Sequence, residues 1–411
     1  MNSSFAVVSD DSGLEDHPHE DWRNWWKTKM DDASLSKNAL DFTAALMDAG
    51  IKRECLHIAR SARIYERLVV FMFLHLVFYR GTVELRNLRT DVLYTAQATW
   101  ASWTEYQLLT SHHIVRDTIL QCSQTFSTDR ALFGIKPRCM IELDISDIQS
   151  KILSSLNDQS EKKAFYHISL DNPTPMLNLL QELLDRCEPL CENNGLLSRA
   201  VARLSKRSGC YHDCLILSDI QRTGEHPVAG GGFAGVWRGS CGGNPVALKA
   251  LRIFDKSSRE AALKEFSHEA TMWRQLVHPN ILPFYGVFKG DDSFDRLCLV
   301  SPWMDAGIAP KYLATHPNAD RVSLLADVAK GLDYLHSFAT PIVHGDLKGA
   351  NIFVTSTLTA CLGDFGLSLF KDSVDSTLGS TTEAAMVIPD DPAEKLTVIH
   401  LDVYVLRPSP L

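Results

Sequence analysis

The sequence predicts an α+β protein in which a mainly helical first half precedes a small antiparallel sheet. Apolar residues recur at helical spacing through much of the first 212 residues. From Leu215 onward, short apolar runs are punctuated by glycine, as in strands joined by tight turns. Between residues 342 and 366, aspartates, an asparagine and a lysine stand at the ends of such runs. The chemistry of the protein is therefore expected in its second half.

Composition narrows the classes of function. A length of 411 residues accommodates two or three domains. The net charge of -9 argues against a chain that wraps nucleic acid. Ten scattered cysteines do not form a disulfide framework, so we predict a reducing, cytoplasmic location. The N-terminus has no basic and apolar segments of a signal peptide, and none is expected.

The first 170 residues give structural but no chemical signals. Residues 1–20 are predicted to be a disordered acidic tail, and residues 21–170 a mainly helical region that offers a surface for a protein partner. Trp22, Trp25 and Trp26 fall on one helical face, which indicates a core stripe rather than a cofactor box. The apolar run Leu68–Tyr79 is shorter than the roughly 18 residues of a membrane span, so we predict a buried element containing His75, with an interfacial role as the alternative.

Residues 171–212 predict a pair of helices that leads into the sheet. The first begins after Asn172-Pro173-Thr174-Pro175 and the second precedes Cys210, with a break expected at Asn193-Asn194-Gly195. Apolar stripes are formed by Met176, Leu177, Leu180, Leu183 and Leu184, and by Leu197, Ala200, Val201 and Leu204. The basic residues Arg199, Arg203, Lys206 and Arg207 predict a solvated face, or alternatively a surface for phosphate or acidic groups. The spacing of Cys187, Cys191, Cys210 and Cys214 favours packing over a zinc site.

A glycine-rich segment, His226–Gly239, predicts a strand, a glycine turn and a second strand. Nucleotide phosphates need a backbone that approaches closely and presents N–H groups, which glycine permits. Gly230, Gly232 and Gly235 have the spacing of G-x-G-x-x-G, although a plain hairpin shows the same pattern. Because a strand rather than a helix follows, the segment is not a dinucleotide-binding turn of the Rossmann type.

The next strand, Val246–Lys249, ends in a lysine that can reach phosphates bound at the glycine segment. Such an ammonium needs a carboxylate partner to hold it in place. The predicted helix over residues 259–276 offers Glu265 and Glu269, and it buries Leu263, Phe266, Ala270 and Trp273.

Two polar motifs follow, Ile342–Asn351 and Leu362–Gly366. Together they supply carboxylate and amide oxygens for Mg²⁺, a carboxylate to orient an attacking hydroxyl, and a cation for the γ-phosphate. Either motif alone is compatible with an ordinary loop. Their joint occurrence after the glycine segment and Lys249 predicts phosphoryl transfer.

These motifs, with His278–Gly286 and Leu299–Met304, resemble the protein kinase family. The resemblance is to the tyrosine-kinase-like group of serine/threonine kinases, and within it to the expanded kinases of mushroom-forming fungi. It covers residues 213–382 and implies an N-lobe of antiparallel sheet plus αC helix with an incomplete helical C-lobe. No Ala-Pro-Glu follows Asp364, so we expect a domain truncated after the activation loop and an aberrant or unstructured tail over residues 383–411.

The resemblance implies a role for each matching residue. Lys249 would hold the α- and β-phosphates, with Glu269 preferred as its partner because of its distance from His278. Asp346 would orient the hydroxyl of a protein substrate, and Lys348 would contact the γ-phosphate. Asn351 and Asp364 would hold Mg²⁺. ATP would be bound by the glycine segment, the following strand and the hinge, through Ala229, Gly230, Gly231, Gly232, Phe233, Ala234, Val236, Ala247, Ser301 as gatekeeper, Pro302, Trp303 and Met304.

Two further departures from the family pattern matter. Aligning Phe233 and Val236 with the family places Ala229, Gly231 and Ala234 at the glycine positions, and we prefer this register. Gly345 replaces the arginine that reads an activation-loop phosphate, so control by such a phosphate is not expected. Two alternatives to an active kinase remain: a pseudokinase-like module that binds nucleotide or a partner, and a helical interaction scaffold with a kinase remnant.

Overall fold

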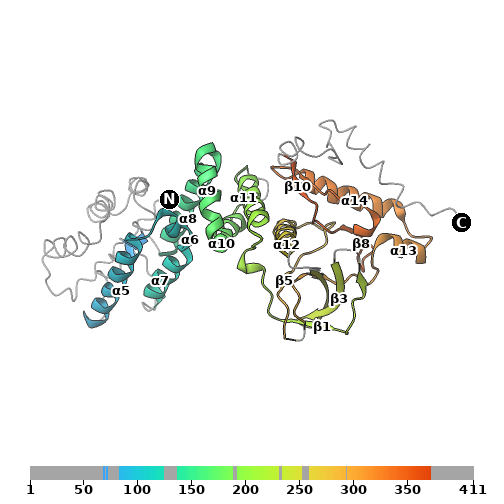
Figure 1. Ribbon diagram of the computed structural model, residues 1–411, viewed down its shortest axis with the longest axis horizontal. Coiled ribbons are helices and arrows are strands. Elements are labelled where there is room, and N and C mark those ends of the chain that lie inside the picture. Colours follow the sequence, from blue (N-terminus) through green and yellow to red (C-terminus); the bar gives the residue numbers. More distant parts are fainter. Residues whose placement is uncertain are drawn as a thin grey trace, which may run out of the picture. The chain divides into compact units, whose positions relative to one another are not determined.

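The computed structural model describes residues 68–69, 71–72, 83–124, 137–187, 192–230, 234–251, 259–292 and 294–371 (Figure 1). The chain divides into two compact units, residues 1–151 and 152–411. Each unit is described by itself. The N-terminal tail, the three tryptophans near residue 25, His75 and the C-terminal tail lie outside the described residues.

The described part of the first unit consists of helices and their short connections. Its helices are α5 (Val83–Ala101), α6 (Glu105–Thr110) and α7 (His112–Gln124), and α8 (Pro137–Asn157) begins in it. Thr104 starts α6 with a capping box, in which its hydroxyl accepts from the Gln107 N–H and the Gln107 side chain accepts from the Thr104 N–H. Leu68, Val69, Phe71 and Met72 are helical and buried, so the buried element is confirmed for these four residues.

The second unit begins with the helices α9 (Gln159–Asp171), α10 (Pro173–Asp185) and α11 (Glu192–Ser208). Pro173 stands in the first turn of α10, where its missing N–H needs no partner. Both predicted apolar stripes are buried, which confirms them.

The predicted break at Asn193-Asn194-Gly195 is wrong, because these residues form the beginning of α11. Backbone N–H groups in a first helical turn have no intrahelical acceptor, so asparagine and glycine are tolerated there. Gly195 is also needed for close packing, since a Cβ at this position would lie 3.1 Å from Thr340 Oγ1.

An antiparallel sheet follows the helices. Its strands are β1 (Ile220–Thr223), β2 (Ala229–Gly230), β3 (Ala234–Cys241), β4 (Asn244–Leu251), β5 (Gly286–Phe288) and β6 (Cys298–Pro302). The order is β1-β3-β4-β6-β5, with β2 paired to β3. Gly242 and Gly243 connect β3 to β4 at φ of 54° and 84°, which suits a tight hairpin.

Helix α12 (Arg259–Arg274) precedes β5 and carries one side of the core of this unit. Phe266, Ala270 and Trp273 are buried in a cluster that also holds residues of the following helical part. That part contains α13 (Ala309–Thr315), α14 (Arg321–His336) and two small strand pairs, β7 (Ile342–Val343) with β10 (Leu369–Phe370) and β8 (Ile352–Val354) with β9 (Ala360–Leu362). The predicted α+β fold is confirmed.

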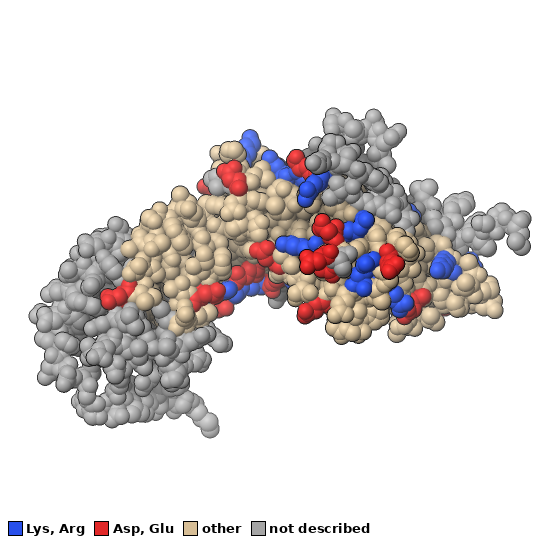
Figure 2. Space-filling model, turned by 60° about the horizontal axis from the view of Figure 1, so that its bottom comes forward, with Lys and Arg blue, Asp and Glu red and all other residues tan. Residues whose placement is uncertain are grey.

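The distribution of charged side chains and the character of the helices are relevant to the kinds of partner that the sequence predicts. On the face shown in Figure 2, lysine and arginine side chains are interspersed with aspartate and glutamate side chains. Within the described residues, no helix combines the length and the apolar character that crossing a bilayer requires.

Candidate active site

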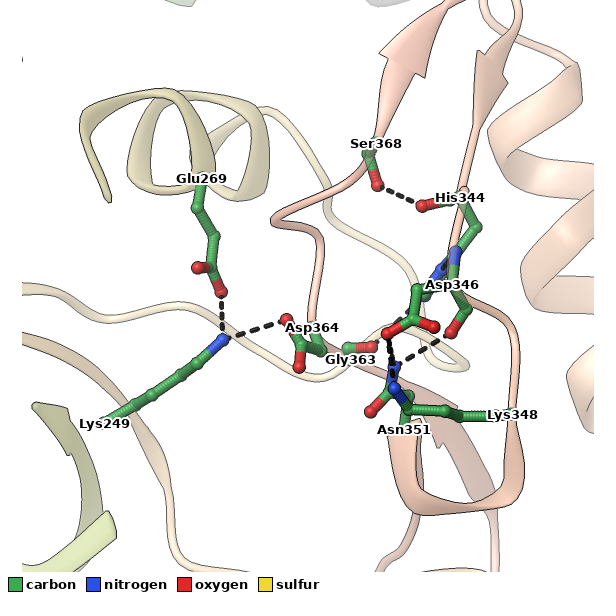
Figure 3. Close-up of polar contacts among 9 residues, drawn as sticks. All are labelled: Lys249, Glu269, His344, Asp346, Lys348, Asn351, Gly363, Asp364 and Ser368. Atoms are coloured by element: carbon green, nitrogen blue, oxygen red, sulfur yellow. Dashed lines mark hydrogen bonds and ion pairs between the residues drawn. The ribbon is translucent and has the colours of Figure 1, made fainter. Parts of the chain in front are cut away.

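The first part of the candidate site is an ion-pair triad that joins three distant segments (Figure 3). Lys249 stands on β4, where the strand register pairs it with Val236 on one side and Leu299 on the other. Its Nζ lies 2.7 Å from Oε1 of Glu269 on α12 and 2.9 Å from Oδ1 of Asp364. Glu269 is 20 residues and Asp364 is 115 residues from Lys249, so only the folded domain brings them together.

Burial and charge compete in this triad. Burial alone would lower the pKa of Lys249, but attraction to Glu269 and Asp364 outweighs it, and the pKa is raised. Burial raises the pKa of Glu269 despite the neighbouring ammonium. Burial also opposes ionisation of Asp364, yet the charge of Lys249 dominates and lowers its pKa. The lysine is thus held cationic at neutral pH beside Asp364 as a carboxylate.

The backbone around Asp364 fixes the direction of its side chain. Asp364 is left-handed, with φ of 66°, whereas the next residue, Phe365, is fully buried against Trp273. Gly366 then passes close to α12, and a Cβ there would lie 3.3 Å from Glu269 Oε2. The chain therefore anchors an aromatic ring in the core and turns the preceding carboxylate toward Lys249.

The second part of the site is a compact cluster in the loop between β7 and β8. Asp346 Oδ2 accepts from Lys348 Nζ at 2.7 Å and from Asn351 Nδ2 at 3.0 Å. Asn351 Nδ2 also donates to the Asp346 carbonyl oxygen at 2.8 Å. Because the amide nitrogen is used in this way, the Oδ1 atom of Asn351 is left to accept from, or to ligate, another group.

A buried histidine connects the two parts. His344 Nε2 lies 3.2 Å from the carbonyl oxygen of Gly363, and Ser368 Oγ donates to the His344 carbonyl oxygen at 3.0 Å. Burial lowers the pKa of His344, so the ring is neutral at pH 7. These contacts hold the loop of Asp346 beside the segment of Asp364 (Figure 3).

Comparison with known proteins agrees with the resemblance to protein kinases that the sequence motifs indicate. Residues 223–397 match the family model described as protein tyrosine and serine/threonine kinase. Within this match the structure describes most of the sheet, α12, α13, α14 and the two polar loops. Over these residues the chain is similar to a protein kinase domain.

Several curated kinases are similar to part of the chain. A putative L-type lectin-domain containing receptor kinase I.4 of Arabidopsis thaliana is 34% identical over 35% of the chain and 22% of the relative. The probable serine/threonine-protein kinase SIS8 of the same plant is 31% identical over 50% of the chain and 20% of the relative. The RAF proto-oncogene serine/threonine-protein kinase of Xenopus laevis is 28% identical over 54% of the chain and 34% of the relative. The chain thus spans about a third or less of the length of these relatives.

Of the remaining residues predicted for nucleotide binding, those that the structure describes lie on the antiparallel sheet or directly after it. Ala229 pairs with Val236, and Gly230 pairs with Gly235, while Gly231, Gly232 and Phe233 lie outside the described residues. On β4 and β6, Ala247 pairs with the buried Ser301. Pro302 ends β6, and Trp303 and Met304 follow it, both half-buried.

Sequence reasoning missed the buried groups behind this site. His268 on α12 bonds through Nε2 to the Ser368 carbonyl oxygen at 3.0 Å, and Ser205 on α11 contacts α12 directly. A single buried serine or histidine adds nothing to the hydrophobic periodicity of a helix. The partners on α12 and at Ser368 lie 62 and 100 residues away in the sequence from Ser205 and His268, respectively. No sequence pattern in this chain indicates these contacts.

Proposed function

We propose that the protein transfers the γ-phosphoryl group of ATP to serine or threonine of a protein substrate, with Mg²⁺ as cofactor. The observation that supports this most directly is the convergence of Lys249, Glu269 and Asp364 with the Asp346–Asn351 loop. Phosphoryl transfer needs positioning and charge stabilisation more than covalent chemistry, and this arrangement supplies fixed charges of both signs. The Asp-Leu-Lys form of residues 346–348 favours serine/threonine over tyrosine as the acceptor.

The donor set fits Mg²⁺. Hard divalent cations prefer carboxylate and amide oxygens, and Asp364 and Asn351 offer one of each. The side chain of Asp364 is 40% exposed, so it is accessible as well as ionised. Asn351 is held by its nitrogen to Asp346, which leaves its oxygen available. We therefore assign metal binding to Asn351 and Asp364.

We assign the binding of the nucleotide base and phosphates to the antiparallel sheet and the hinge that follows it. Met304 uses its carbonyl oxygen to accept from Gly307 N–H at 3.0 Å, whereas its own N–H has no acceptor among the described residues. That N–H, at the hinge, suits an adenine ring. The pairing of Ala229 with Val236 supports the register in which Ala229, Gly231 and Ala234 occupy the glycine positions and Val236 covers the base.

In the proposed reaction, ATP with Mg²⁺ supplies an electrophilic phosphoryl group whose leaving oxygen is neutralised. Lys249, held by Glu269, orients the α- and β-phosphates. Asp346 accepts a hydrogen bond from the substrate hydroxyl and orients it for attack. Lys348, 2.7 Å from Asp346, stabilises the negative charge on the transferring group.

Further proposals concern the kinase group, the cellular location and the partner of the protein. We propose that the kinase belongs to the tyrosine-kinase-like group, resembles the fungal kinases named above, acts in signalling in the cytoplasm, and binds a protein partner through its N-terminal helices. A pseudokinase-like role is less well supported, because Lys249, Asp346, Asn351 and Asp364 are all present.

A transfer assay tests the proposed function. Purified protein is incubated with γ-labelled ATP, Mg²⁺ and a generic basic protein substrate, and Asp346→Ala is the matched control. We expect phosphoserine or phosphothreonine that depends on Asp346, with a loss of about 10²- to 10⁴-fold in the variant. Nucleotide binding without any Asp346-dependent transfer would favour the pseudokinase alternative.

A further inference from the structure

We infer that Ser205, on helix α11 before the matched kinase region, is a positioning residue that holds α12 so that Glu269 meets Lys249. The inference rests on the proposed function, because it assigns a further residue to the same reaction. It comes from a buried hydrogen-bond junction between α11 and α12, which lie side by side in Figure 1.

The Ser205 hydroxyl is completely buried and has three polar neighbours. Its Oγ lies 2.9 Å from the carbonyl oxygen of Ser267 and 2.9 Å from Oγ1 of Thr271, both on α12. The carbonyl oxygen of Cys210, just beyond α11, lies 2.7 Å away. Thr271 donates to Ser205, and the single Ser205 proton is shared between the two carbonyl oxygens. One hydroxyl therefore joins the end of α11 to the middle of α12.

This junction lies opposite the ion pair on the same helical turn. Ser267 and Thr271 are each two residues from Glu269, which places them about 200° around the helix axis at 3.6 residues per turn. Lys249 therefore holds one side of this turn at 2.7 Å, and Ser205 holds the other. A displacement or rotation of α12 has to break the Ser205 contacts before Glu269 leaves the lysine.

The rest of the helix pair supports the same placement. Ala202 on α11 is buried in one apolar cluster with Phe266 and Met272 of α12. Directly after α12, Gln275 Nε2 donates to Gln181 Oε1 on α10 at 2.8 Å. At the end of α12, Arg274 Nη2 lies 3.3 Å from Oδ1 of Asp185, the last residue of α10. Helices α10 and α11 thus pack against α12, and Ser205 makes the buried polar contact at the centre of the interface between α11 and α12.

The first test measures the mobility of α12 without requiring activity. Ser205→Ala leaves the Thr271 hydroxyl buried without its acceptor, so we expect amide hydrogen exchange over residues 267–273 to quicken roughly tenfold. The matched control is Ser198→Ala, on the same helix, because Ser198 is 2% exposed and donates to Asn194 within α11 at 3.1 Å. We expect no change over α12 in this control. Equal exchange of α12 in both variants would overturn the inference.

The second test asks whether Ser205 acts through Glu269. Ser205→Ala should lower kcat roughly tenfold in the wild-type background and have no further effect in a Glu269→Gln background. A merely structural role gives the same factor in both backgrounds, and that result would overturn the inference. Absence of Asp346-dependent transfer by the wild type would instead refute the proposed function, and the exchange measurement would still decide whether Ser205 holds α12 in place.

Discussion

The two parts of the site differ in how they are built. The triad joins residues 20 and 115 positions apart, and Glu269 in it has a side chain that is only 10% exposed. The Asp346 cluster joins residues two and five positions apart, and its Lys348 side chain is 50% exposed. The local loop is formed by its own sequence, whereas the triad exists only when the sheet, α12 and the Asp364 segment are packed. The contacts within the triad therefore depend on the packing of the whole domain, whereas those within the Asp346 cluster are local.

Matched lysine substitutions test this difference most strongly. We expect Lys249→Met and Lys348→Met each to reduce transfer by about a hundredfold to a thousandfold. Lys249→Met should also lower the free energy of unfolding by about 2 kcal/mol, because it leaves the buried Glu269 without its partner. Lys348→Met breaks an exposed pair and should change stability by less than about 0.5 kcal/mol. Chemical denaturation of both variants makes the measurement, and equal losses of stability would contradict the comparison.

Ligand binding tests whether Asp364 binds the metal and Asp346 orients the substrate, as proposed. Mg²⁺-ATP at 100 times its Kd should stabilise the wild type by about 2.7 kcal/mol, seen as a higher melting temperature. Asp364→Asn should abolish this shift, because it removes a proposed ligand of the metal. Asp346→Asn should retain most of the shift, since Asp346 is assigned to the substrate hydroxyl. Loss of the melting-temperature shift in both variants would show that the triad and the Asp346 cluster bind the nucleotide together.

Gly345 tests how tightly the loop is held against the Asp364 segment. It is left-handed, with φ of 80°, and a Cβ there would collide with the carbonyl oxygen of Leu367. Gly345→Ala should cost about 2 to 3 kcal/mol of unfolding free energy, from strain and from displacement of Leu367. Gly224→Ala is the control, because Gly224 has φ of 84° and open space around it, and it should cost about 1 kcal/mol. Similar losses of unfolding free energy in both variants would mean that Leu367 can move away from residue 345 at little cost.

Sequence patterns predicted what is local in this domain. The strand of Lys249, the Asp346 loop and the Asp364 turn were found from short motifs, and the stripes of α10 and α11 from their spacing. The strand does not end at Lys249 as predicted, because β4 continues to Leu251. The expected helix break at Asn193-Asn194-Gly195 failed because these residues form the first turn of α11, where the backbone N–H groups have no intrahelical acceptor in any sequence. The junctions of Ser205 and His268 were not predicted, since each depends on a partner more than 60 residues away. The assigned roles of the site residues, the domain boundaries and the truncation stay predictions.

The packing of α10 and α11 against α12 has a practical consequence for recombinant expression. The family match begins at residue 223, and trimming the gene there would remove α10 and α11. Such a fragment would uncover the apolar surface that Ala202 now covers next to Phe266, and it would leave Thr271 without Ser205. Exposed apolar surface of this kind promotes aggregation. A soluble fragment of the second half should therefore start no later than residue 152, where the compact unit begins.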